Sequence, residues 1–255
     1  MSHRFSRTPL AAGALLALAA LAPLPLRAQD DGVPLGPGSR IVSRTIVEAD
    51  SARGWTIAVR VPAIEGPAAT EPGWAGFEAR VDSIVAAEVA DFRASHAEWV
   101  DPPDPEWISF LEADGSIVWV DPPLLSLVLE VSVYYAGAAH PGHYGTTLVW
   151  DAERGRALTL AELFRPGTAW LEALARETIP VLEAELGEMA DPGWIAEGAG
   201  PDPANYARWA LVEDGLLVLF DPYQVAPYAA GPQAVTVRRA ALAEVADPAG
   251  PLGPR

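Results

Sequence analysis

The longest regular pattern in the sequence is an alternation of apolar and polar side chains from Leu124 to Tyr135. Its apolar members are Leu125, Leu127, Leu129, Val131, Val133 and Tyr135, and Glu130 and Ser132 fall between them. Successive side chains of a strand point to opposite faces of a sheet, so this period of two predicts a strand with one covered face. Because sheets covered on one face are typically antiparallel, the chain is constrained to a layered fold around an antiparallel sheet.

A second pattern has a helical period. Apolar residues recur at spacings of three and four over the segment 74–99, at Trp74, Phe77, Val81, Ile84, Val85, Val89, Phe92 and Trp99. A surface helix buries such a stripe, so we predict a long amphipathic helix whose apolar side belongs to the core and not to a cofactor site. His96 lies near the end of this helix and is interpreted as a packed or capping residue.

Shorter segments complete the expected fold. Strands are predicted at 41–48, 54–62, 116–120, 145–150, 206–212, 216–220 and 234–237, with hairpins across 50–53 and 213–215. A capping box of Thr159 and Glu162 indicates a short helix, and Thr168 is expected to cap a longer one that kinks or restarts at Pro180. The fold class is therefore α+β, with antiparallel sheets, a long amphipathic helix in the N-terminal module and helices packed on the C-terminal sheet.

The first residues have the order of a secretory signal. Arg4 and Arg7 precede an apolar run from 9 to 26, and Ala28 is a small residue at the expected cleavage point. The prediction is a cleaved signal peptide over 1–28, with a retained N-terminal anchor as the alternative. Localisation is expected to be periplasmic or secreted, with no membrane span in the mature chain.

Composition shifts divide the rest of the chain. Residues 29–38 are rich in Gly and Pro and are predicted to form a flexible leader. A first module is assigned to 39–120 and a second to 121–246. The Pro- and Gly-rich residues 247–255 are expected to be a loose tail.

Cysteine content and charge restrict the partners. The chain has no cysteine, so no disulfide staples it. Cleavage would remove three of its 17 basic residues and none of its 34 acidic ones, leaving a formal charge of −20. We therefore exclude nucleic acid as a partner, whereas basic proteins and cations are compatible. The same charge is also explained by solubility alone.

Sequence signatures of catalysis are missing. The chain has no G-x-S-x-G elbow, no H-E-x-x-H, no phosphate-binding glycine loop and no cysteine nucleophile. Carboxylates are so numerous that no pair of them indicates a glycosidase. The prediction is that no cofactor is used and that the protein is not a conventional enzyme.

One constellation of interest lies in the loop after the long alternating strand, where His140 and His143 are separated by two residues. Two imidazoles at such a turn can bind Zn²⁺ or Ni²⁺, but a third ligand is required and none is evident nearby. The commoner arrangement is that His140 hydrogen-bonds the backbone and His143 is exposed, so no metal site is assigned.

The second constellation is the loop FDPYQVAPYAAG, residues 220–231. Prolines fix the backbone beside rigid tyrosine rings, a composition typical of a preorganised recognition loop. The alternative is that the rings fold back over the sheet edge. We predict that both loops form a ligand-binding surface, with the members Tyr135, Gly137, His140, His143, Tyr144, Pro222, Tyr223, Pro227 and Tyr228.

Three separated motifs carry a family resemblance. YYAGAAHP at 134–141, LVWD at 148–151 with GRALTLAELF at 155–164, and GLLVLFDPYQVAPYAAG at 215–231 resemble the DUF3298 domain of RsiV-like proteins over about 121–245. Upstream, WTIAVRVP at 55–62 followed by the long helix is similar to the DUF4163 module of RsiV and of PdaC-type peptidoglycan deacetylases. The usual Asn at the start of that helix is not evident.

The resemblance implies an exported α+β domain, and the member function best understood is recognition of lysozyme by an anti-sigma factor. This sequence has neither a sigma-binding segment nor a deacetylase motif, so only a binding role carries over. The leading hypothesis is an exported cell-envelope binding protein that recognises lysozyme, another wall-active protein or peptidoglycan. One alternative is a wall hydrolase or metal-assisted enzyme using His140 and His143; another is a structural envelope protein.

Overall fold

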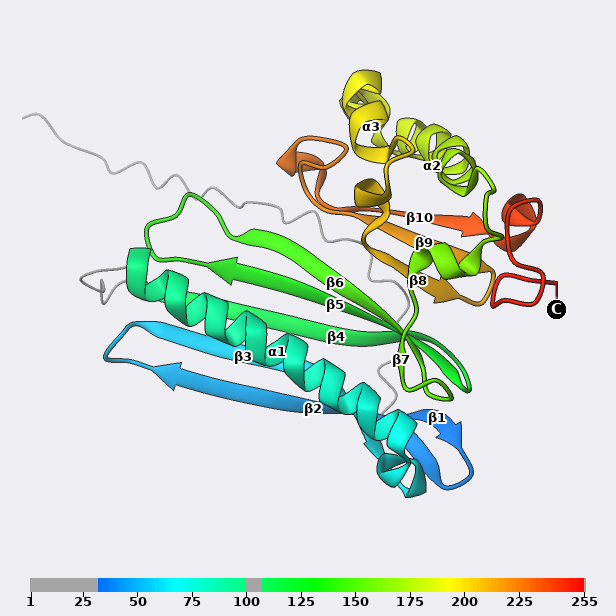
Figure 1. Ribbon diagram of the computed structural model, residues 1–255. Helices are drawn as coiled ribbons and strands as arrows, with labels where there is room; N and C mark the ends of the chain where they lie inside the picture. The colour runs from blue at the N-terminus through cyan, green and yellow to red at the C-terminus, as the bar shows by residue number, and fades with distance from the viewer. Residues whose placement is uncertain (1–31, 100–106, 255) are drawn as a thin grey trace, which may run out of the picture.

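The computed structural model describes residues 32–99 and 107–254 (Figure 1). The predicted signal peptide, 1–28, lies outside these residues. The described chain forms two lobes that both contain helix and strand, which confirms the α+β class. None of the helices within 32–99 and 107–254 is long and apolar enough to span a membrane.

The N-terminal lobe is a seven-stranded sheet whose strands lie side by side in chain order. They are β1 (Val33–Gly36), β2 (Ser39–Asp50), β3 (Trp55–Glu65), β4 (Ser109–Asp121), β5 (Leu124–Tyr134), β6 (Gly142–Asp151) and β7 (Arg156–Ala157). Neighbours are antiparallel except β3 and β4, which are parallel and are connected through α1 (Pro72–Trp99). The hairpin predicted at 41–48 and 54–62 is confirmed, with Ile46 opposite Val59.

Helix α1 covers one face of this sheet, as Figure 1 shows. From Trp74 to Phe92 the predicted apolar stripe is confirmed as core, because Phe77, Val81 and Phe92 are almost fully buried against strand residues such as Ile57 and Leu127. His96 is also packed here, with 4% of its surface exposed. The last predicted member, Trp99, is instead 76% exposed at the end of the helix. The alternation along β5 likewise places Leu125, Leu127, Leu129, Val131 and Val133 on the α1 face, whereas Val128 packs on the opposite face, against the small sheet.

The C-terminal lobe is a three-stranded sheet with helices on its outer face. Its order is β10–β9–β8, with β8 at Trp209–Val212, β9 at Gly215–Phe220 and β10 at Gln233–Arg238; the helices are α2 (Trp170–Leu186) and α3 (Pro192–Ala199). Every residue of β9 is buried, since Leu216, Val218 and Phe220 face the helices while Leu217 and Leu219 face the large sheet. The layers are therefore α1, the seven-stranded sheet, the three-stranded sheet, and α2 with α3.

Strand β8 is the edge of the small sheet, and it lies against the large one. The backbone N–H of Trp209 donates to Thr147 Oγ1 at 3.0 Å, and that of Leu211 donates to Ser126 Oγ at 3.0 Å. Both hydroxyls come from the face of the large sheet opposite α1. They satisfy backbone donors that an edge strand would otherwise leave without partners.

Several segments differ from the sequence expectations. The expected flexible leader contains β1, which pairs with residues 39–41. The expected boundary between 120 and 121 falls within one continuous sheet. The expected loose tail is held down, because Leu252 is 1% exposed and the Arg239 guanidinium donates to the carbonyls of Pro251 and Gly253.

The second helix also departs from its expected start and course. Ala169, and not Thr168, occupies the N-cap of α2, and the helix runs through Pro180 without a break. The capping box at 159–162 is present, with Glu162 accepting the Thr159 N–H at 2.7 Å.

Candidate functional site

Two loops that are far apart in the chain meet at one end of the molecule. One joins β5 to β6, and the other joins β9 to β10. The Tyr228 hydroxyl donates to the carbonyl of Pro141 at 2.9 Å. The ring of Tyr228 also stacks on that of His140, with centroids 4.2 Å apart and planes inclined by 30°.

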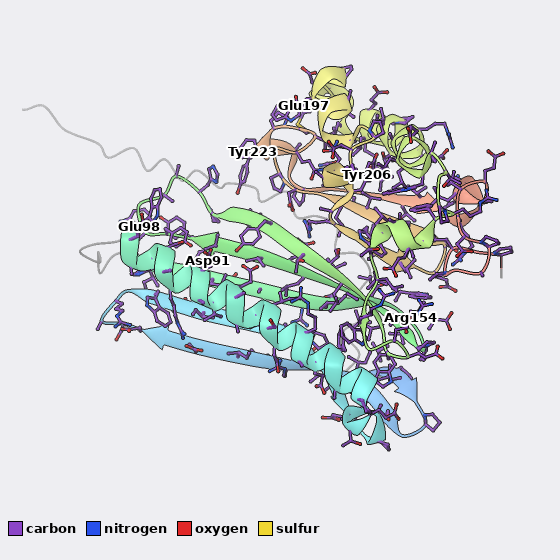
Figure 2. All side chains as sticks on the ribbon, viewed as in Figure 1. Asp91, Glu98, Arg154, Glu197, Tyr206 and Tyr223 are labelled. Atoms are coloured by element: carbon purple, nitrogen blue, oxygen red, sulfur yellow. The ribbon has the colours of Figure 1, made fainter. Side chains whose placement is uncertain are left out.

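The rings of His140, His143, Tyr223 and Tyr228 together form a cluster that we call the aromatic tip. Tyr223 and His143 lie 5.6 Å and 6.2 Å from Tyr228, centroid to centroid. Tyr223 is 55% exposed and lies at the end of the C-terminal lobe (Figure 2). Burial, with a smaller contribution from Tyr223, raises the pKa of Tyr228 above the ordinary value for tyrosine.

The backbone that presents Tyr223 is strained. Its φ of 71° lies in the left-handed region, which is an outlier for a bulky residue and costs about 1–3 kcal/mol. The indole Nε1 of Trp194 donates to the Tyr223 carbonyl at 2.9 Å and holds this geometry from α3. Strain of this kind is concentrated at functional sites, where the surroundings enforce it.

Gln224 braces the same loop from within. Its amide nitrogen donates to the carbonyls of Gly198 and Asn205 at 2.9 and 3.0 Å, and its amide oxygen accepts the Asp221 N–H at 3.2 Å. Gly198 permits the approach, since a Cβ there would lie 1.8 Å from the Gln224 carbonyl oxygen. The loop is therefore rigidly attached to α3 before any ligand arrives.

A buried arginine connects the two lobes near these loops. The Arg208 guanidinium pairs with Glu130 of β5 at 2.7 Å and with Asp221 of the loop between β9 and β10, which we call the tyrosine loop, although only 8% of the side chain is exposed. Its Nε has no hydrogen-bond partner within the part of the chain that the structure describes. Gly145 makes room, because a Cβ there would lie 2.4 Å from the guanidinium. Desolvation raises the pKa of Glu130, and Arg208 opposes that rise.

Sequence reasoning did not identify Arg208. The signal was an isolated cation directly before an apolar strand, at Arg208-Trp209-Ala210. Such a residue is buried only when it is paired. Its two partners are 78 and 13 residues away, so the sequence alone could not name them.

The predicted site residues divide into two groups. The loops bring His140, His143, Tyr223 and Tyr228 together, and Gly137, Pro222 and Pro227 lie in the same loops. Tyr135 and Tyr144 lie on the opposite, α1 face of the sheet. Tyr135 stacks on Phe92 at 5.7 Å, and the Tyr144 hydroxyl donates to Glu88 at 2.7 Å. Tyr144 follows His143 directly in β6, so the two must point to opposite faces.

The histidines behave as the commoner alternative predicted. His140 Nδ1 lies 2.8 Å from the Pro141 carbonyl oxygen, and His143 is exposed. Within 32–99 and 107–254, no group of three His, Asp or Glu side chains is arranged to hold a metal ion. Exposed ring faces and carboxylates of this kind can contact a ligand.

Residues 161–240 match the family DUF3298, described as a protein of unknown function, and a DUF3298 domain is therefore present. Among curated proteins, the chain is 32% identical to the immunogenic protein MPT64 of Mycobacterium tuberculosis, over 48% of this chain and 52% of that protein. It is 27% identical to the peptidoglycan-N-acetylmuramic acid deacetylase PdaC of Bacillus subtilis, over 53% of this chain and 29% of PdaC. An esterase of M. tuberculosis is 28% identical to it, over 43% of this chain and 47% of the esterase. The match spans about half the length of the mycobacterial relatives and less of PdaC.

Two solved structures share the fold. A DUF3298 protein of Bacteroides fragilis superposes with a TM-score of 0.57 at 16% identity, covering 82% of this chain and 94% of that one. A DUF3298 protein of Pseudomonas aeruginosa superposes with a TM-score of 0.51 at 17% identity, covering 88% of this chain and 98% of that one. The likeness therefore extends across both lobes and concerns the fold alone.

Proposed function

With a DUF3298 domain as the premise, we propose that this chain is an exported cell-envelope binding protein whose aromatic tip contacts a basic wall-active protein such as lysozyme. The observation that carries the proposal is the exposed Tyr223 ring, held on strained backbone beside Tyr228 and Asp221. The resemblance of the loop motifs to RsiV-like proteins supports the choice of lysozyme.

The physical basis is preorganisation. Gln224 and Trp194 hold the backbone of this loop, so its rings lose less conformational entropy on binding, and each could contribute about 2 kcal/mol when a partner buries it. The acidic balance of the chain, 34 acidic against 17 basic residues, would accelerate encounter with a basic partner.

Binding of the purified protein to hen lysozyme, measured by biolayer interferometry at low and high salt, tests the proposal. Tyr223→Ala and Tyr228→Ala should each weaken binding about tenfold or more at both salt concentrations, while salt should slow association of the unmodified protein. Tyr144→Phe, which alters a tyrosine on the α1 face, is the matched control and should bind normally. Undiminished binding by both folded alanine variants would remove the tip from the interface.

A second candidate ligand is peptidoglycan, which the similarity to PdaC favours. Co-sedimentation with purified peptidoglycan, using the same variants, separates this ligand from lysozyme. The hydrolase alternative is supported only by the names of PdaC and the mycobacterial esterase. It requires turnover of acetylated glycan or ester substrates that His140→Ala and His143→Ala abolish. A protein that binds neither ligand and turns over no substrate would fit the structural alternative.

A further inference from the structure

One margin of the large sheet has no partner strand. Strand β1 pairs only with residues 39–41 of β2, and on its other side β2 pairs with β3 throughout. From Val42 to Asp50, therefore, no described segment of 32–99 or 107–254 pairs with the outer edge of β2, which forms the lower border of the sheet in Figure 1. A run of unpaired N–H and C=O groups is a template for another strand.

On this edge of β2, two opposite charges lie at equal distances from Ile46. Ile46 lies midway between Val42 and Asp50, and Arg44 and Glu48 lie two residues before and after it. All three point toward the α1 face, because they alternate with exposed Ser43, Thr45 and Val47. If two copies of the strand pair antiparallel with Ile46 opposite Ile46, each Arg44 lies opposite the Glu48 of the other copy.

Both charges are already held in place by α1. Asp82 pairs with Arg44, and Arg93 pairs with Glu48. Across a twofold axis at Ile46, the charges would run Asp82, Arg44, then Glu48 and Arg93 of the second copy, with alternating sign along the whole row. Charged side chains commonly protect an edge strand from pairing, but opposite charges that face each other across two strands stabilise the pair, so this pattern favours a second copy over an unrelated strand.

We propose that β2 binds β2 of a second copy of this chain, antiparallel and with Ile46 on the twofold axis. Val47, which is 72% exposed, is then covered by Thr45 of the other copy on the face away from α1. The pairing ends where the free margin ends, at β1 on one side and at the turn after Asp50 on the other. The two large sheets become one, and the aromatic tips lie on strands remote from the axis.

Sedimentation velocity over a range of protein concentrations measures the association. The protein should form a dimer, and Arg44→Glu should raise its dissociation constant about tenfold or more, since two like-charge contacts replace two ion pairs. Arg40→Glu is the matched control on the same strand, because Arg40 pairs with Glu65 outside the proposed contact. Adding Glu48→Arg to Arg44→Glu should restore dimerisation. A protein that stays monomeric, or one equally affected by both single variants, overturns the proposal.

The absence of cysteine provides a test of the register. Directly opposed residues of antiparallel strands have Cα atoms about 4.5–5.5 Å apart, within disulfide range, and diagonal ones about 7–8 Å, which is not. Ile46→Cys should therefore cross-link to itself under mild oxidation, whereas Thr45→Cys and Val47→Cys should each cross-link poorly alone and well when mixed. Circular dichroism confirms that each variant is folded. Cross-linking at 45 or 47 alone that equals cross-linking at 46 would refute the register.

Discussion

The two sheets treat their edges in opposite ways. At β8 the edge donors of Trp209 and Leu211 are satisfied by hydroxyls of the neighbouring sheet, and the strand is buried. At β2 the edge from Val42 to Asp50 faces outward, and its side chains alternate between exposed and half-buried. An edge strand therefore becomes part of the core where the chain supplies hydroxyl acceptors, and remains a binding surface where it does not.

The largest expected effect comes from removing one of those acceptors. Ser126 is fully buried, and Ser126→Ala leaves the Leu211 N–H without a partner. We expect a loss of about 2 kcal/mol in the free energy of unfolding, measured by urea denaturation. Ser43→Ala on the exposed face of β2 should change it by less than about 0.5 kcal/mol. Equal effects of the two substitutions would abolish the contrast between the edges.

A smaller effect is expected at the other hydroxyl. Thr147→Val removes the acceptor for the Trp209 N–H, but Thr147 is only half-buried and water can replace it in part. We expect a loss of about 1 kcal/mol by the same measurement. Thr45→Val, the same substitution on the exposed β2 face, is the control. A destabilisation by Thr45→Val as large as that by Thr147→Val would count against this account.

The tyrosine loop is the strained part of the otherwise covered C-terminal lobe. Ala at position 223 would keep the left-handed backbone strained, whereas Gly adopts it readily. Tyr223→Gly should therefore be more stable to urea than Tyr223→Ala by about 1 kcal/mol, although neither retains the ring. If Ala proves the more stable, the φ of 71° is not enforced in solution.

Acid should affect the two lobes in different pH ranges. Burial, with help from Arg53, lowers the pKa of His96 below 6.5, so the unfolded chain takes up the proton first and stability falls as the pH drops below 6.5. Arg156 and Thr159 lower the pKa of Glu162 from 4.5 to about 2, so its contribution persists above pH 4.5 and is lost toward pH 2.

These two contributions can be separated by measuring the free energy of unfolding in urea at a series of pH values, for the unmodified protein and for His96→Leu and Glu162→Gln. Each variant should flatten the stability profile in its own range only. The Glu162 effect should stay below about 1 kcal/mol, because its ion pair is partly exposed. A Glu162→Gln profile that changes near pH 6 and not below 4.5 would contradict the assignment.

Local patterns predicted α1, β2, β3, β5 and most of β6 because periodicity reports burial directly, but only the second half of β4, 116–120 of Ser109–Asp121, was expected. The stripe from Trp74 and the alternation from Leu125 sufficed for α1 and β5. Strand β1 escaped prediction because it is four residues long, VPLG, and owes its conformation to pairing with 39–41. The tail around Leu252 is held by Arg239, a contact that no local pattern records.

The candidate site was predictable in composition but not in orientation. Pro and Tyr identified the 221–231 loop, and the paired histidines identified its neighbour. The alternation of β6 would have separated Tyr144 from His143, but the strand was expected to begin at Gly145, and it begins at Gly142. The burial and pairing of Arg208 depend on how the two sheets pack together, which residue spacing does not encode.

The strand order has a consequence for how the chain assembles in time. The seven strands of the large sheet are consecutive, so that sheet can be completed as the chain emerges from its N-terminus, before β8 exists. Its surface, with Ser126 and Thr147 in place, then acts as the template on which the last lobe condenses. We expect residues 32–160 to protect their amides from hydrogen exchange when produced alone, and residues 161–255 to need the first lobe; the reverse result would refute this order.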